Sequence, residues 1–194
     1  MQSIAISIKT IPDIETGRRL YKIKNLSDDG VAKAMFHLHQ QKAGSETLPH
    51  YLQKIVAIAV CVENEGVIQT TLLGDEKITE KALLELYATA TKGRQQVTWN
   101  GNNSDFPILQ YRALKWGVAL EGSSNHLDLS RKLSYGGDNE CPSLYEVSCF
   151  LDLPELQQDS ADAIWKLWQS DDTSAIYASA KRDLSNVYQI FSLF

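Results

Sequence analysis

The chain has 194 residues, of which 43% are hydrophobic and 22% charged, as is typical of a globular protein with one buried core. Its net charge of −5 argues against a broad electrostatic grip on nucleic acid and leaves room only for a local basic groove. No apolar run approaches the length of a membrane span, and the N-terminus lacks the order of a signal peptide. The three cysteines, Cys61, Cys141 and Cys149, show no paired spacing. We therefore expect a reduced, cytoplasmic protein that forms a single domain over residues 1–194, with no membrane contact and no zinc site.

The N-terminal residues 3–9 have the alternating pattern of a strand with one apolar face. The apolar face carries Ile4, Ile6 and Ile8, and the other face carries Ala5, Ser7 and Lys9. Pro12 and Gly17 then predict a loop over residues 10–17, with a short helical turn at 17–21.

The later elements are predicted from apolar periodicity, helix caps and turn residues. Helices are expected at about 28–41, 79–91, 105–116, 143–151, 160–168 and 173–191. Further strands are expected at 54–62, 67–73, 96–99 and 126–129, the first of them buried on both faces. The helical stripes are expected to bury Val31, Ala34, Met35 and Leu38; Ala82, Leu83, Leu86 and Ala90; and Ile164, Leu167 and Trp168. This order predicts an α/β fold, a mixed central sheet flanked by helices.

The stretch 95–114, QQVTWNGNNSDFPILQYRAL, joins a strand to a helix through a polar turn at 100–104. Acid and amide groups at such a junction often bind a ligand. Asp105 is the candidate acid here. Alternatively, it only satisfies backbone N–H groups at the start of the helix.

A second candidate acid, Asp183, lies on the apolar stripe of the last predicted helix. That stripe consists of Ile176, Ala180, Asp183, Val187 and Phe191. A buried carboxylate is costly unless it is paired or bound to metal. Asp183 is therefore either an acid at the edge of the stripe that reaches solvent, or a ligand or catalytic acid.

Two weaker acidic patterns have structural explanations. His126 and Asp128 are two apart in a predicted strand, and a structural pairing is favoured over a metal site. Asp13 and Glu15 form a DxE pattern, but it follows Pro12 and falls in a predicted loop, which is a poor frame for a rigid two-metal site.

The chain resembles the predicted 3′-5′ exonucleases related to the exonuclease domain of family-B DNA polymerases, of the DnaQ-like, ribonuclease H-like superfamily and DEDDy type. The matching segments are WNGNNSDFPILQYRAL, HLDLSRKLS with SLYEVSCFLDLPEL, RDLSNVYQIFSLF and the N-terminal strand with IPDIETGRRLY. The resemblance implies a ribonuclease H-like fold. It also implies a site in which four carboxylates hold two divalent cations for phosphodiester hydrolysis, with a tyrosine that helps to orient the water.

This sequence keeps only part of that site. The resemblance places Asp105 and Asp183 at two of the four acids, and Asn100, Gly101 and Asn102 along the nucleic-acid groove. The first-strand phrase D-I-E-T-I-P-D is matched by residues 7–13, so that Ser7 and Lys9 occupy the two acidic positions. Ser179 occupies the tyrosine position.

We hypothesise that Lys9 replaces metal, its ammonium reaching Asp105, Asp183 or both. The expected function is then an exonuclease-like nucleic-acid-binding domain with an impaired site, no cofactor, and single-stranded DNA or RNA or a protein as partner. One alternative is an active Mg²⁺- or Mn²⁺-dependent 3′-5′ exonuclease with a rearranged site that uses Asp13, Glu15, Asp105 and Asp183. The other is a protein-interaction module without nucleic-acid contact.

Overall fold

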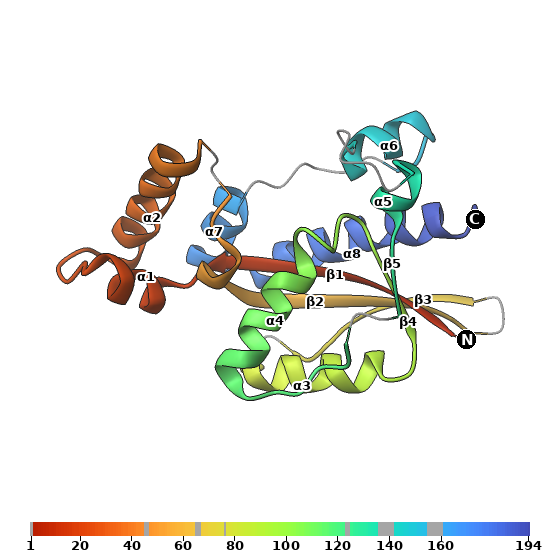
Figure 1. The fold of residues 1–194 in the computed structure, drawn as a ribbon, viewed down its shortest axis with the longest axis horizontal. Coiled ribbons are helices and arrows are strands. Elements are labelled where there is room, and N and C mark those ends of the chain that lie inside the picture. The colour runs from red at the N-terminus through yellow and green to blue at the C-terminus, as the bar shows by residue number, and fades with distance from the viewer. Residues whose placement is uncertain are drawn as a thin grey trace.

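The computed structural model describes residues 2–44, 47–64, 67–75, 77–122, 125–135, 142–154 and 161–194. Its centre is a five-stranded sheet with the strand order β3-β2-β1-β4-β5 (Figure 1). The strands are β1 (Ser3–Pro12), β2 (Gln53–Asn64), β3 (Val67–Leu72), β4 (Gln95–Thr98) and β5 (His126–Asp128). β2 pairs antiparallel with β1 and β3, whereas β4 pairs parallel with β1 and β5. The sheet is therefore mixed, as the order of elements predicts.

Helices cover both faces of this sheet. They are α1 (Ile14–Tyr21), α2 (Asp28–Ala43), α3 (Glu80–Thr91), α4 (Asp105–Trp116), α5 (Leu129–Leu133), α6 (Leu144–Phe150), α7 (Ala161–Gln169) and α8 (Thr173–Phe191), with a 3-10 turn, η1 (His50–Leu52). α8 packs on one face, and α3 and α4 on the other, while α1 and α2 lie together at one end of the molecule (Figure 1). Among the described residues, no helix combines the length and the apolarity that a membrane crossing requires. Ser160, the predicted start of one helix, and Cys141 lie outside the described residues.

The alternation predicted for β1 is confirmed. Ile4 and Ile6 pack into the core cluster that contains residues of α3 and α4. Ala5 packs into the cluster on the opposite face, with Leu184 of α8. The polar side of β1 therefore faces α8, and this places Lys9 opposite that helix.

The loop predicted over residues 10–17 is wrong. β1 continues to Pro12, because its pairing with β2 resumes after an irregularity between Lys9 and Thr10. Asp13 then caps α1, accepting a hydrogen bond from the Thr16 backbone N–H at 3.1 Å. A strand and a helix therefore meet where Pro12 suggested irregular chain.

Some predicted helical stripes are displaced around the helix axis. In α3, Leu86 is 41% exposed, and the buried residues are Glu80, Leu83, Leu84, Tyr87 and Thr91. The apolar pattern misplaces this stripe because two of the buried residues are polar. Glu80 accepts a hydrogen bond from the Ile55 backbone N–H, and Thr91 donates one to the Tyr87 carbonyl oxygen. Likewise Leu38 and Trp168 are 39% and 36% exposed, while Trp165 is buried.

Candidate functional site

The side chains of Lys9 and Asp183 meet between β1 and α8. Lys9 Nζ lies 2.6 Å from Asp183 Oδ2, and the two side chains are 12% and 25% exposed. Of the predicted contacts of Lys9 with Asp105 or Asp183, the one with Asp183 is therefore present. The expected stripe of α8 is also largely confirmed, since Ile176, Ala180 and Val187 are buried and Asp183 lies at the partly buried edge of that stripe. This contact is a charge-assisted hydrogen bond, which is stronger than one between neutral groups.

Asp105 is the first residue of α4 and is partly buried. Its Oδ1 accepts a hydrogen bond from Ser104 Oγ at 3.1 Å. Burial raises the pKa of Asp105 to about 7; the Ser104 hydrogen bond and the Lys9 charge oppose this shift, and the charges of Asp128 and Asp183 add to it. The charges of both members of the ion pair therefore act on Asp105, while its hydrogen bond comes from Ser104.

Asp128, at the end of β5, fixes the backbone of the turn at residues 100–104. The two carboxylate oxygens of Asp128 accept hydrogen bonds from the backbone N–H groups of Asn100, at 2.9 Å, and Asn102, at 3.0 Å. Gly101 packs so closely on Thr98 that a Cβ there would lie 2.1 Å from Thr98 Oγ1. The three predicted groove residues thus form one tight turn that leads into Asp105 and can accept no side chain at Gly101.

The other predicted positions also have defined surroundings. Ser7 and Ser179 are both buried, at 8% and 1% exposure. His126 Nε2 lies 2.8 Å from Thr98 Oγ1, and its ring packs edge-on against Phe106. His126 and Asp128 are therefore both engaged in structural contacts, but with other residues and not with each other as the sequence predicts.

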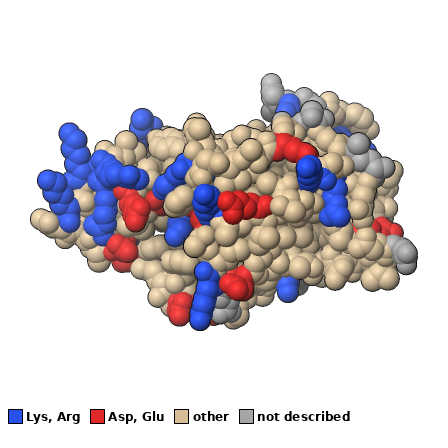
Figure 2. All heavy atoms as spheres, turned by 90° about the horizontal axis from the view of Figure 1, so that it is seen from below, with Lys and Arg blue, Asp and Glu red and all other residues tan. Residues whose placement is uncertain are grey.

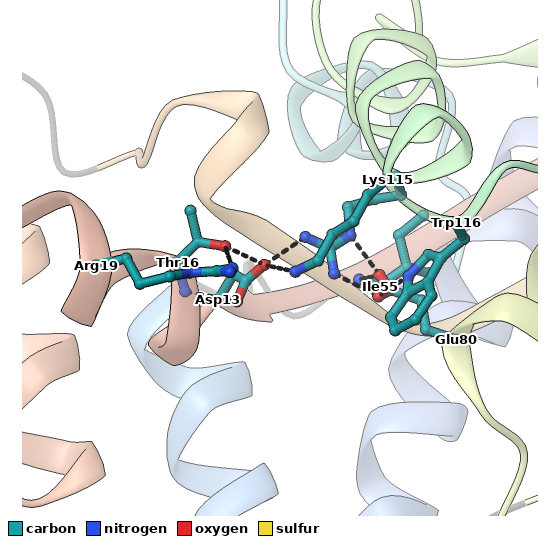
Figure 3. Close-up of polar contacts among 8 residues, drawn as sticks. Asp13, Thr16, Arg19, Ile55, Glu80, Lys115 and Trp116 are labelled. Carbon is teal, nitrogen blue, oxygen red and sulfur yellow. Dashed lines mark hydrogen bonds and ion pairs between the residues drawn. The ribbon is translucent and has the colours of Figure 1, made fainter.

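A second charged cluster is centred on Arg112 of α4, and Figure 3 shows its partners Asp13, Glu80, Lys115 and Trp116. Arg112 Nη1 contacts Asp13 Oδ2 at 2.5 Å, Arg112 Nε contacts Glu80 Oε1 at 2.7 Å, and Arg112 Nη2 pairs with Glu80 Oε2. Lys115 Nζ also reaches Asp13 Oδ2, at 2.7 Å, and Trp116 donates to Glu80 Oε2 at 2.8 Å. This Arg112 cluster joins the end of β1 to α3 and α4.

The contacts of Asp13 in the Arg112 cluster argue against the alternative in which Asp13 and Glu15 bind metal ions. Burial alone would raise the pKa of Asp13, but hydrogen bonds from Lys115, Arg112 and the Thr16 backbone together lower it well below its usual range. Asp13 also accepts from Thr16 Oγ1, at 2.9 Å, and Glu15 is exposed on α1. Because the oxygens of Asp13 are already engaged by two cations, they are poor ligands for a divalent ion.

The donor set around Lys9 does not fit two divalent cations. Asp105 and Asp183 supply carboxylates, but the Lys9 ammonium is bonded to one of them, and Ser7 supplies no charge. Within the described ranges, no three His, Cys, Asp or Glu side chains are grouped so that they could hold a metal ion. Hard cations need several oxygen ligands, and a neighbouring ammonium repels them.

Residues 45–122 match the model of a family described as "Predicted 3'-5' exonuclease related to the exonuclease domain of PolB". The predicted resemblance is confirmed. The matched exonuclease-like segment runs from before β2 to just beyond α4, and so contains the turn at 100–104, Asp105 and Arg112. No curated protein sequence gives a significant match.

The fold is similar to that of a solved structure, the family B DNA polymerase from the hyperthermophilic archaeon Pyrobaculum calidifontis. The TM-score is 0.62 at 11% sequence identity, and the alignment covers 99% of this chain. It covers 24% of the polymerase chain, so this chain corresponds to about a quarter of that protein. The fold class is therefore the ribonuclease H-like α/β fold that the sequence predicts.

Sequence reasoning missed two residues that shape the site. Asp128 was considered with His126 and not as the support of the turn at 100–104, although an acid two residues before Ser130 is the usual pattern of a helix cap. Arg112 gave no signal of its own, because its partners Asp13 and Glu80 lie 99 and 32 residues away in the chain.

Proposed function

We propose that this chain is an exonuclease-like domain that binds single-stranded nucleic acid and does not hydrolyse it. The observation that carries the proposal is the contact between Lys9 Nζ and Asp183 Oδ2 at 2.6 Å. An ammonium at this position supplies one positive charge in place of the two divalent cations of a complete site, and it cannot activate water as a metal ion does.

Support for binding comes from the turn at 100–104, whose backbone is held in one defined geometry. Asp128 fixes that geometry through Asn100 and Asn102. A rigid polar turn at the start of a helix is a suitable place to receive a phosphate or a base edge.

The test of impaired catalysis is a nuclease assay on single-stranded DNA and RNA with Mg²⁺ or Mn²⁺. We expect no hydrolysis above the background of an Asp105→Ala variant prepared in the same way. Hydrolysis by the natural chain that disappears in Asp105→Ala would contradict the proposal and favour the active exonuclease.

A gain-of-function variant tests the role of Lys9 directly. Ser7→Asp with Lys9→Glu restores both acids of the first strand beside Asp105 and Asp183. We expect it to bind Mn²⁺ in isothermal titration calorimetry, whereas the natural chain and the neutral control Ser7→Asn with Lys9→Gln do not. No Mn²⁺ binding by the restored variant would show that the lost acids alone do not explain the altered site.

A second candidate function, a protein-interaction module, is favoured by an apolar hollow of about 350 Å³. Its lining consists of Leu133, Pro142, Val147, Phe150, Leu151, Ile190, Leu193 and Phe194. Phe150 and Leu193 are 83% and 69% exposed, and such apolar surface is characteristic of interaction sites. A binding titration against salt separates the two candidates: binding to phosphates weakens as salt rises, and an absence of binding at low salt favours the interaction module.

A further inference from the structure

Two tyrosines stand half-exposed beside each other, away from the ion pair at Lys9. Tyr51 lies in η1 and is 44% exposed, and Tyr111 lies in α4 and is 48% exposed. Their ring centroids are 6.0 Å apart, with an angle of 68° between the planes. An edge-to-face pair with open ring surfaces can stack further flat π-systems, which every nucleic-acid base provides.

This tyrosine pair is joined to the predicted groove. His50, the neighbour of Tyr51, places Nε2 2.9 Å from the carbonyl oxygen of Asn103, in the turn that leads into Asp105. Tyr111 is six residues beyond Asp105 on the same helix, which corresponds to about 9 Å along the helix axis. A strand that lies against the turn can therefore reach both rings within a few nucleotides.

Beyond the tyrosines the surface becomes basic. The segment from Thr16 to Leu26 contains four cations and no acid, in a chain whose net charge is −5. These cations are Arg18, Arg19, Lys22 and Lys24. Lys and Arg gather at the end of the molecule that α1 and α2 form, on the left in Figure 2. Arg18 pairs with Asp28, whereas Arg19, Lys22 and Lys24 are exposed.

The tyrosine pair and the basic segment are contiguous. α1 contacts η1, and η1 contacts α4, so that the three elements form one surface. Tyr21, at the end of α1, packs with Leu52 of η1 in one core cluster, and burial together with the nearby Tyr51 raises the pKa of Tyr21. The order along this surface is turn, aromatic pair and cations.

We propose that Tyr51 and Tyr111 stack bases of a single-stranded nucleic acid whose backbone continues onto Arg19, Lys22 and Lys24. This inference rests on the proposed nucleic-acid-binding function and adds the path of the strand. Aromatic platforms beside a cationic groove are the usual means of binding single strands without sequence preference. A local path of this kind also reconciles binding with the acidic charge of the whole chain.

The test measures fluorescence anisotropy of labelled single-stranded poly-dT and poly-rU with the full chain at several salt concentrations. Tyr51→Ala and Tyr111→Ala should each weaken binding by about fivefold or more, because loss of one stacked base costs about 1–3 kcal/mol. Tyr51→Phe should bind like the natural chain, because the ring is kept. Tyr135→Ala is the matched control, since Tyr135 is 99% exposed and lies after α5, distant in sequence from both tyrosines.

The cations are tested by Arg19→Ala, Lys22→Ala and Lys24→Ala combined. This triple variant should lower the salt dependence of log K by about 0.7 for each lost phosphate contact. The charge-matched control is Lys77→Ala, Lys81→Ala and Lys92→Ala, three exposed lysines around α3. If the natural chain binds and the tyrosine and cation variants bind equally well, the path is wrong while the proposed function stands. If the natural chain binds neither polymer, both the proposed path and the proposed function are wrong. The exposed tyrosines would then favour a protein partner at this surface.

Discussion

Lys9 sets the charge of the candidate site, because its ammonium lies against Asp183. Lys9 keeps its place on the polar side of β1, opposite α8, as the alternation of the strand requires. Its ammonium neutralises Asp183 directly and acts on Asp105 at longer range. The ammonium therefore offsets the charge of one carboxylate, Asp183, and burial holds down the ionisation of the other, Asp105.

Asp105 should titrate far from the usual range of an aspartate. We expect an apparent pKa near 7 in a ¹³C NMR titration of its carboxyl carbon, assigned by the missing signal in Asp105→Asn. Lys9→Met should raise this pKa further by removing a positive charge, whereas Asp183→Asn should lower it by removing a negative one.

The control for this titration is Asp152, an exposed aspartate in the turn after α6. Its signal should not respond to either substitution. An Asp105 pKa that ignores both Lys9→Met and Asp183→Asn would show that the three side chains do not share one electrostatic site.

At the scale of elements, the sequence predicts most strands and helices to within a few residues, because their apolar periodicity is local information. The errors fall where distant partners decide the structure. Thr10 to Pro12 are strand because β2 pairs with them across a bulge, and Glu80 is buried because Arg112 neutralises it. The candidate site was predictable only in part. The contact between Lys9 and Asp183 could be predicted from the resemblance, whereas the supporting role of Asp128 is seen only in the fold.

Arg112 should be among the most destabilising positions to truncate, because it neutralises two buried carboxylates from different elements. Arg112→Ala leaves Asp13 and Glu80, both less than 10% exposed, without their shared cation. We expect a loss of about 3–5 kcal/mol in the free energy of unfolding, measured by urea denaturation.

Arg131→Ala is the comparison for Arg112, because Arg131 is exposed on α5. It should change the unfolding free energy by less than about 0.5 kcal/mol. A loss below about 1 kcal/mol for Arg112→Ala would mean that Lys115 and water satisfy the two acids, and that the Arg112 cluster does not hold the elements together.

At the scale of the whole molecule, the two charged clusters make opposite contributions to stability as pH changes. The pKa of Asp13 is lowered by folding, so its contribution is present above the pKa of the unfolded chain and is lost as pH falls below about 4. The pKa of Asp105 is raised, so its contribution is full below about 4 and is lost as pH rises towards 7. The first cluster therefore weakens the fold in acid, and the second weakens it towards neutral pH.

Urea denaturation followed by tryptophan fluorescence across this pH range should resolve the two contributions. Asp105→Asn should gain stability relative to the natural chain as pH rises from about 4 to 7, since an amide has no charge to bury. Asp13→Asn should be less stable than the natural chain at neutral pH, and this deficit should shrink as the solution is acidified, because protonation removes the same charge from Asp13. Asp152→Asn, whose φ of 53° suits asparagine, should run parallel to the natural chain throughout. The contrary result is a constant difference in the free energy of unfolding between Asp105→Asn and the natural chain at every pH. Asp105 would then titrate alike in the folded and unfolded chains, and electrostatic coupling to Lys9 and Asp183 would not explain the site.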